Sequence, residues 1–88
     1  MRGLVLGLVA TGVLAASAMP AQAQCQALWV ERNSIYKAYG YCFKTDRARD
    51  YFGNRGCQYN YEGDIPLSGR DRARIARILA EERSYGCR

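Results

Sequence analysis

The chain has 88 residues, a formal net charge of +5 and no histidine. A chain of this length forms one domain at most, and its core is small without additional restraints. The lack of histidine excludes catalysis by a Ser-His-Asp or Cys-His arrangement and excludes imidazole ligation of a metal. We therefore expect no metal and no other cofactor, and we expect the protein not to be an enzyme.

The first residues are typical of a cleavable secretory signal peptide. Arg2 provides a positive charge, an apolar run extends to about residue 18, Pro20 interrupts a helix, and residues 21–23 form an Ala-x-Ala cleavage site. We predict a signal peptide over residues 1–23, cleaved after Ala23, and a single domain over residues 24–88. The mature protein is then periplasmic or secreted.

Other interpretations of the N-terminal segment fit its residues less well. A retained membrane helix needs about 20 apolar residues, whereas this run is shorter and holds three glycines, so we expect no stable membrane span. Cleavage after Ala18 is the main alternative to cleavage after Ala23. A lipid anchor on Cys25 is not expected, because Gln22 and Gln24 stand where a lipobox has an aliphatic and a small residue.

A first helix is predicted over residues 25–39. Leu28, Ile35 and Tyr39 share one face at helical spacing. Gly40 follows, and glycine readily adopts the left-handed conformation that ends a helix. The first predicted element therefore ends at the turn that begins with Gly40.

A second, short helix is predicted from Asp46 to about Phe52. Thr45 is a suitable N-cap and Asp46 is favourable in the first turn. Gly53-Asn54 is a stop signal. The polar segment over residues 57–66 is expected to be a loop.

The last predicted helix has the clearest pattern. Ser68 and Asp71 fit a capping box, in which the serine oxygen accepts from the Asp71 amide and the carboxylate reaches back to Ser68. Glu81 lies within reach of Arg77 at i, i+4, and Gly86 ends the helix. The expected apolar stripe comprises Ile75, Ala76, Ile78 and Leu79.

All four cysteines lie beyond the predicted signal peptide, and an even number in a short exported chain is typical of two disulfides. Four cysteines allow three pairings. If the first and last helices pack antiparallel, Cys25 lies beside Cys87, while Cys42 and Cys57 bracket the middle helix. This layout favours Cys25–Cys87 with Cys42–Cys57. The predicted fold is an all-α, disulfide-stapled domain of about three helices.

Aromatic residues are the unusual part of the composition: seven tyrosines, two phenylalanines and one tryptophan. Tyrosine and tryptophan suit both glycan stacking and protein interfaces. Tyr59 and Tyr61 in the predicted loop, with Arg55 nearby, are our candidates for surface binding. The larger apolar side chains are assigned to packing: Leu28, Trp29, Ile35, Tyr36, Phe43, Phe52, Ile75, Ile78 and Leu79.

The mature segment resembles the YARHG domain family, small extracytoplasmic bacterial domains named for a Tyr-Ala-Arg-His-Gly run. The resemblance lies in residues 25–36, in Gly40 to Thr45, and in Tyr51 to Cys57. In the name motif, Tyr36 and Gly40 match, but Lys37-Ala38-Tyr39 replaces Ala-Arg-His, so any role of the family's histidine is absent here. The resemblance implies an exported helical domain and adds no activity.

These features favour a small, non-enzymatic binding or interaction module of the bacterial envelope. The expected partner is an envelope polymer or an exported protein, and export argues against nucleic acid despite the basic charge. One alternative is a small inhibitor or accessory subunit of an exported enzyme. A less favoured alternative is a minimal glycan hydrolase using carboxylates such as Asp46 or Glu62, although Asp46 and Asp50 alternate with arginines as on a solvated helix.

Overall fold

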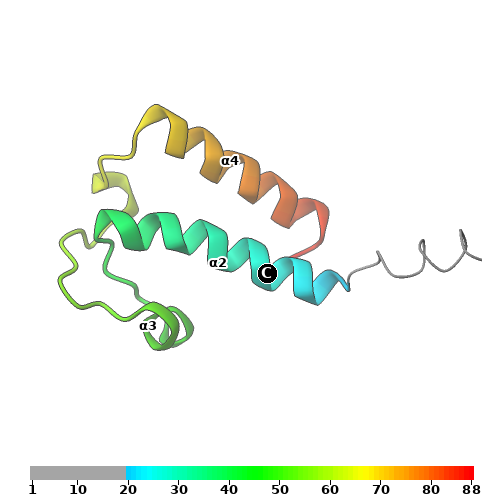
Figure 1. Cartoon of the computed structure of the whole chain (residues 1–88), viewed down its shortest axis with the longest axis horizontal. Coiled ribbons are helices and arrows are strands. Elements are labelled where there is room, and N and C mark those ends of the chain that lie inside the picture. Colours follow the sequence, from blue (N-terminus) through cyan, green and yellow to red (C-terminus); the bar gives the residue numbers. More distant parts are fainter. Residues whose placement is uncertain (1–19) are drawn as a thin grey trace, which may run out of the picture.

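A computed structural model describes residues 20–88, so the predicted signal sequence up to residue 19 lies outside the described residues. Within this part of the chain there are three α-helices and one short 3-10 helix: α2 (Ala21–Tyr39), α3 (Asp46–Phe52), η1 (Glu62–Asp64) and α4 (Gly69–Ser84). Helix α2 lies in the middle, with α4 along one side and α3 against the other (Figure 1). The predicted all-α class is confirmed for the described residues.

Helix α2 is longer than the sequence pattern predicts. It begins at Ala21 rather than near residue 25, with Pro20 in extended conformation at its N-cap. Alanine has the highest helix propensity, so Ala21 and Ala23 continue the helix across the predicted cleavage site. The cleavage position itself stays a prediction.

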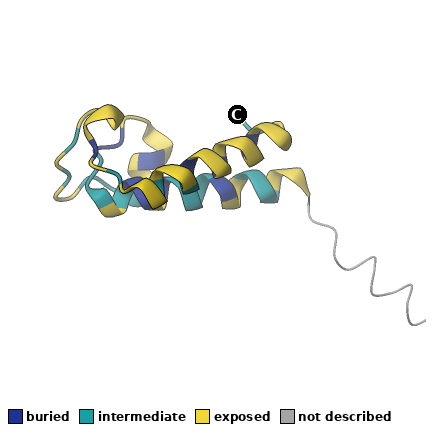
Figure 2. Cartoon of the chain, turned by 90° about the horizontal axis from the view of Figure 1, so that it is seen from above, coloured by how far each residue is buried: buried dark blue, intermediate teal, exposed yellow. Residues whose placement is uncertain are grey.

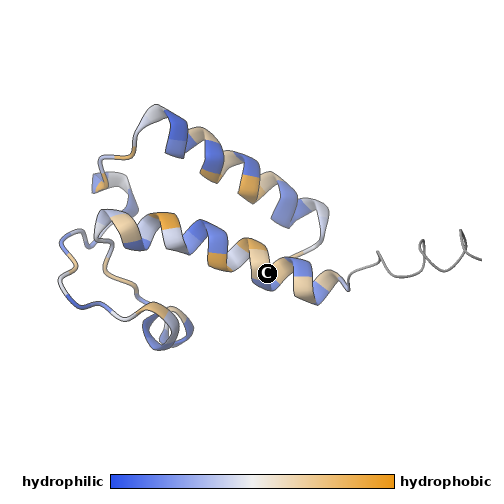
Figure 3. Cartoon of the chain, viewed as in Figure 1, coloured by the Kyte–Doolittle hydropathy of each residue, from blue (hydrophilic) through white to orange (hydrophobic). Residues whose placement is uncertain are grey.

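The core lies between the facing sides of α2 and α4. Leu28, Ile35 and Tyr36 of α2 are buried together with Ile75 and Ile78 of α4. Hydrophobic and hydrophilic residues alternate along both helices (Figure 3). Burial of these side chains is the main driving force for pairing the two helices.

The predicted apolar stripe of α4 is partly wrong. Leu79 is 38% exposed and Ala76 is also exposed, and much of the outer surface of α4 is open to solvent (Figure 2). The buried positions of α4 are Ile75, Ile78 and Glu82, at i, i+3 and i+7. The third buried position is thus occupied by an acidic residue, which hydropathy alone assigns to the surface.

Glu82 is buried because Arg32 of α2 neutralises it. The guanidinium donates two hydrogen bonds to the carboxylate, from Nε to Oε1 at 2.8 Å and from an η nitrogen to Oε2 at 3.1 Å. The two side chains are only 21% and 12% exposed. A bidentate pair of this kind fixes the register of α2 against α4 as well as compensating the buried charge.

The disulfides have the pairing favoured from the sequence. Cys25 and Cys87 join the first turns of α2 to the end of the chain, with 5.5 Å between their Cα atoms. Cys42 and Cys57 are joined across 5.1 Å. The loops closed span 62 and 15 residues, for which loop-closure entropy gives about 4 and about 3 kcal/mol of stabilisation.

Helix α3 and the segments around it form a second packed layer on α2. Ala48 of α3 and Phe43 before it are buried in the same core, and so is Ile65 after η1. The Thr45 hydroxyl accepts a hydrogen bond from the Ala48 amide, as predicted for the N-cap. Gly53 ends α3 at a φ of +72°.

The segments on either side of α3 are held together by main-chain and side-chain hydrogen bonds. The Cys42 amide donates to the Tyr59 carbonyl at 2.8 Å, and the Gln58 amide donates to the Gly40 carbonyl at 2.7 Å. Asn54 accepts from the Phe43 amide and donates to the Phe43 carbonyl. The predicted loop over residues 57–66 is therefore paired to the chain that leaves α2, and it contains η1.

No helix between residues 20 and 88 has both the length and the apolar character needed to cross a membrane.

The Arg32–Glu82 pair leads to a stability prediction. We expect Glu82→Gln to lower the free energy of unfolding by about 2 kcal/mol, because it leaves a partly buried guanidinium without its counter-charge. Glu81→Gln is the matched control, because Glu81 pairs with Arg77 at 3.9 Å where the side chains are 48% and 62% exposed. Loss of this exposed ion pair should lower the free energy of unfolding by less than about 0.5 kcal/mol. Denaturant unfolding of the oxidised protein measures both, and equal losses would contradict the assignment.

Candidate functional site

The candidate site lies at the C-terminal end of α2, where the five positions of the family's name motif fall. Gly40 follows the last helical residue at a φ of +92°, in the left-handed region. Its amide donates to the Lys37 carbonyl, and the Tyr41 amide donates to the Tyr36 carbonyl. A residue with a side chain is strained at this φ, so glycine is required for the chain to turn back toward residues 57–59.

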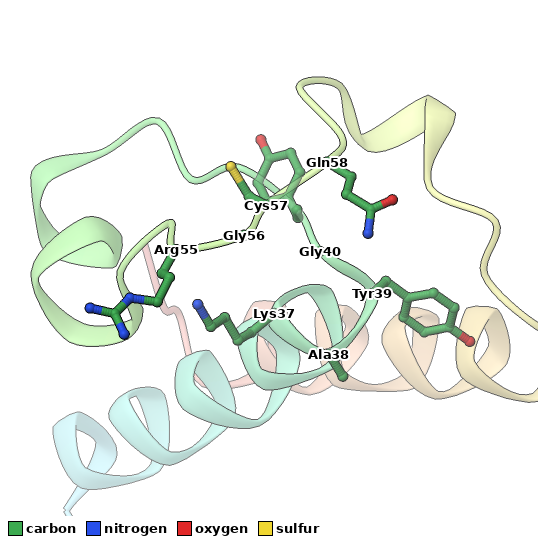
Figure 4. A pocket seen from close by; sticks show the side chains of 9 residues that line it. Lys37, Ala38, Tyr39, Gly40, Arg55, Gly56, Cys57 and Gln58 are labelled. Carbon is green, nitrogen blue, oxygen red and sulfur yellow. The ribbon is translucent and has the colours of Figure 1, made fainter.

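A cavity of about 220 Å³ lies beside this turn. The helix end contributes Lys37 and Tyr39, and the facing loop contributes Arg55 and Gln58 (Figure 4). Gly40 and Cys57 also line it. The Cys42–Cys57 disulfide and the main-chain bonds from residues 58 and 59 to Gly40 fix the two walls relative to one another.

The cavity is positively charged. Lys37 and Arg55 both line it, and none of the lining residues is acidic. In the view of Figure 4 their side chains lie toward one end of the cavity, with Gln58 and Tyr39 toward the other. The Lys37 ammonium donates to the Gly53 carbonyl at 3.1 Å, which holds its charge at the cavity. Arg55 is exposed, and within residues 20–88 no ion pair of its side chain is formed.

Tyr39 has a structural role in this turn. Its hydroxyl donates to Asp71 Oδ2 at 2.7 Å and accepts from the Ser68 amide at 3.1 Å. Ser68 accepts from the Asp71 amide as predicted, and the Ser68 amide donates to the Tyr39 hydroxyl. The Tyr39 hydroxyl is inserted between the two groups, so α2 supplies part of the cap of α4.

The hydrogen bond from Tyr39 lowers the pKa of Asp71 below its usual value, and the hydrogen bond with Ser68 acts in the same direction. The Asp71 carboxylate therefore remains ionised at the N-terminus of α4. A negative charge there also interacts favourably with the helix dipole.

The structure separates the three residues predicted for surface binding. Arg55 lines the cavity at the motif turn. Tyr61 is 71% exposed. Tyr59 is partly buried, packs against the core and forms an isolated bridge with Tyr41, so its assignment to the surface is corrected. Backbone pairing with residues 41 and 42 draws Tyr59 inward, which residue type alone does not indicate.

The carboxylates considered for hydrolysis differ in their surroundings. Asp46 has a side chain 97% exposed, and its contact is with Arg49 at 3.9 Å on the same helix. Glu62 instead accepts from the Tyr36 hydroxyl at 3.4 Å. Among residues 20–88, no group of three or more potential metal ligands is clustered.

Sequence reasoning missed Lys37 and Gln58 as cavity residues. The cavity joins residues that are about twenty positions apart, and only the pairing of the two segments brings them together. The sequence feature that could have pointed to Lys37 is its position inside the name motif, which ends at Gly40.

A model of the YARHG domain matches residues 3–83, which is most of the chain, and the chain therefore belongs to this family. No curated protein matches the chain. No solved structure matches it either.

The Tyr39 bridge leads to a prediction about Asp71. In Tyr39→Phe the carboxylate loses its shortest hydrogen bond, and the pKa of Asp71 should rise toward its usual value near 3.8. A carboxyl group whose pKa is lowered in the folded state stabilises the fold while it is ionised, and this stabilisation is lost as the pH falls and the group is protonated. The variant should therefore lose less stability than the wild type on acidification. NMR titration of the Asp71 carboxyl carbon measures the shift, and an unchanged pKa would contradict the bridge.

Proposed function

We propose that this member of the YARHG domain family is exported and acts as a small, non-enzymatic binding module of the bacterial envelope, recognising a polymer that carries anionic groups. One observation carries the proposal: the cavity at the motif turn combines Lys37 and Arg55 with no acidic lining residue. Two cations in a recess with fixed walls attract a carboxylate or a phosphate.

The shape of the cavity supports recognition of a group on a larger molecule. A volume of about 220 Å³ is below the range of about 300–1,000 Å³ typical of sites that enclose a drug-sized ligand. The cavity is therefore suited to one charged substituent, with the rest of the polymer lying across the surface. Its position beside exposed loop residues leaves room for such an arrangement.

Export places two kinds of anionic polymer within reach. Peptidoglycan carries carboxylates, whereas lipopolysaccharide carries phosphates. Both present the same chemistry to Lys37 and Arg55, so the two are separate arms of one test. The two disulfides fit an oxidising compartment.

The test is retention of the purified, oxidised protein on each polymer. We expect the wild type to be retained on at least one of them, and Arg55→Gln to bind at least about fivefold more weakly, since one of the two cations is lost and 1.4 kcal/mol corresponds to tenfold. Binding should also weaken as salt is added, because exposed charges are screened.

Arg88→Gln is the matched control, because it makes the same charge change beside Cys87, which is bonded to Cys25 at the opposite end of α2 from the cavity. It should be retained like the wild type. Equal weakening in both variants would show that binding depends on net charge alone. Retention on neither polymer, with cross-linking to a single exported protein, would instead favour an accessory subunit.

A further inference from the structure

A second cavity, of about 190 Å³, lies between α2, the segment that leaves it, and η1. Trp29, Tyr41 and Phe43 contribute aromatic rings to its lining. Trp29 is held in place by ring contacts with Tyr51 and Phe52, whose centroids lie 5.6 and 5.7 Å away. The Arg47 guanidinium also lies over the Trp29 ring, 3.8 Å from its centroid, so it covers part of one face. The aromatic part of the cavity is therefore preformed rather than assembled on binding.

Buried Asn33 gives this cavity a polar group in its interior. The residue is only 7% exposed and lines the cavity. Its Nδ2 donates to the Trp29 carbonyl at 2.9 Å, which fixes the amide plane and leaves Oδ1 as an acceptor. Among the described residues no buried side-chain N or O atom lacks a hydrogen-bond partner, so the amide does not require a ligand. Its Oδ1 can still accept from a hydroxyl or amide group that enters the cavity.

Glu62 and Lys44 place groups of opposite charge in the same lining. The Tyr36 hydroxyl donates to Glu62 Oε1 at 3.4 Å, which leaves the other carboxylate oxygen as an acceptor for a ligand. Burial first, and then the charge of Glu62, raise the pKa of both Tyr36 and Tyr41, which is consistent with a carboxylate standing near both rings. Arg32 also lines the cavity, but its charge is matched by Glu82.

The charges of this lining nearly cancel, unlike those of the cavity at the motif turn. A neutral ligand with several hydroxyl groups matches it, because acceptors (Asn33, Glu62) and a donor (Lys44) are both present. Aromatic walls match the apolar C–H faces of a sugar ring. The volume of about 190 Å³ limits the occupant to one ring.

We propose that this second cavity is a carbohydrate subsite that takes a single neutral pyranose ring, with Trp29, Tyr41 and Phe43 as its apolar walls and Asn33 and Glu62 accepting from ligand hydroxyl or amide groups. The subsite deepens the proposed function and rests on it only for the identity of the polymer. Tyr41 lines both cavities, so a neutral ring and a neighbouring anionic group of one glycan can occupy them together.

The only tryptophan of the chain reports on this subsite. Titration of the oxidised protein with chitotriose, a neutral oligosaccharide of N-acetylglucosamine, should give a saturable change in Trp29 fluorescence with a Kd of about 1 mM. Glu62→Gln should weaken binding at least tenfold, because the amide removes the charged acceptor. Asp64→Asn is the matched control, since Asp64 lies in the same short helix and does not line the cavity; it should bind like the wild type.

The outcomes separate this inference from the proposed function. Chitotriose carries no anionic group, so the subsite should bind it even if the anionic polymer is not recognised. An absent or non-saturating fluorescence change in the wild type up to about 10 mM would overturn the subsite. Equal affinities of Glu62→Gln and the wild type would overturn it as well.

Discussion

The antiparallel pairing of α2 with α4 is the constraint on which the rest of this small structure depends. Near the start of α2 the pair is joined covalently by the Cys25–Cys87 disulfide. In the middle it is held by the two hydrogen bonds of Arg32–Glu82, and at the far end by the Tyr39–Asp71 hydrogen bond. Apolar burial alone favours contact between the two helices, but it tolerates slippage along their length. These polar and covalent links, together with the Glu31–Arg74 ion pair at 3.3 Å, remove that freedom, so the end of α2 has a fixed position.

That fixed end of α2 carries the cationic cavity, and the aromatic cavity lies beside the middle of the helix, at Trp29 and Asn33. Gly40 turns the chain, and the segment that follows pairs with residues 57–59 and is bonded to them through Cys42–Cys57. Tyr41, immediately after the turn, lies in the lining of both cavities. The cationic cavity is on the side of Lys37 and Arg55, and the aromatic, nearly neutral one is on the side of Trp29 and Glu62. The name-motif region therefore determines the position of the chain between the two cavities as well as the end of a helix.

The features of the fold that the sequence predicts are the helix ends, which depend on residues close together in the chain. The caps at Thr45 and Ser68, the stop at Gly53 and the end of the last helix near Gly86 were all predicted correctly, because each depends on residues within one turn. The burial of Glu82 and the exposure of Leu79 were not predicted, because they depend on which side of α4 faces Arg32.

The candidate site was predictable only in part, for the same reason. Arg55 was identified from its place near a predicted loop, but its cavity partner Lys37 belongs to a different segment. Tyr59 was assigned to the surface because the sequence does not show its pairing with residue 41. The cavity lined by Asn33 and Glu62 joins residues 29 positions apart in the sequence, and no local pattern relates them.

The most direct test of the account is an NMR titration of the isotope-labelled, oxidised protein with the disaccharide of N-acetylglucosamine and N-acetylmuramic acid, which joins a neutral ring to a carboxylate-bearing one. The account predicts backbone amide shifts on both sides of Tyr41, at the Lys37–Gly40 turn and Arg55 as well as at Asn33 and Glu62. Shifts confined to the exposed arginines of α4, with the residues around Tyr41 unchanged, would contradict it.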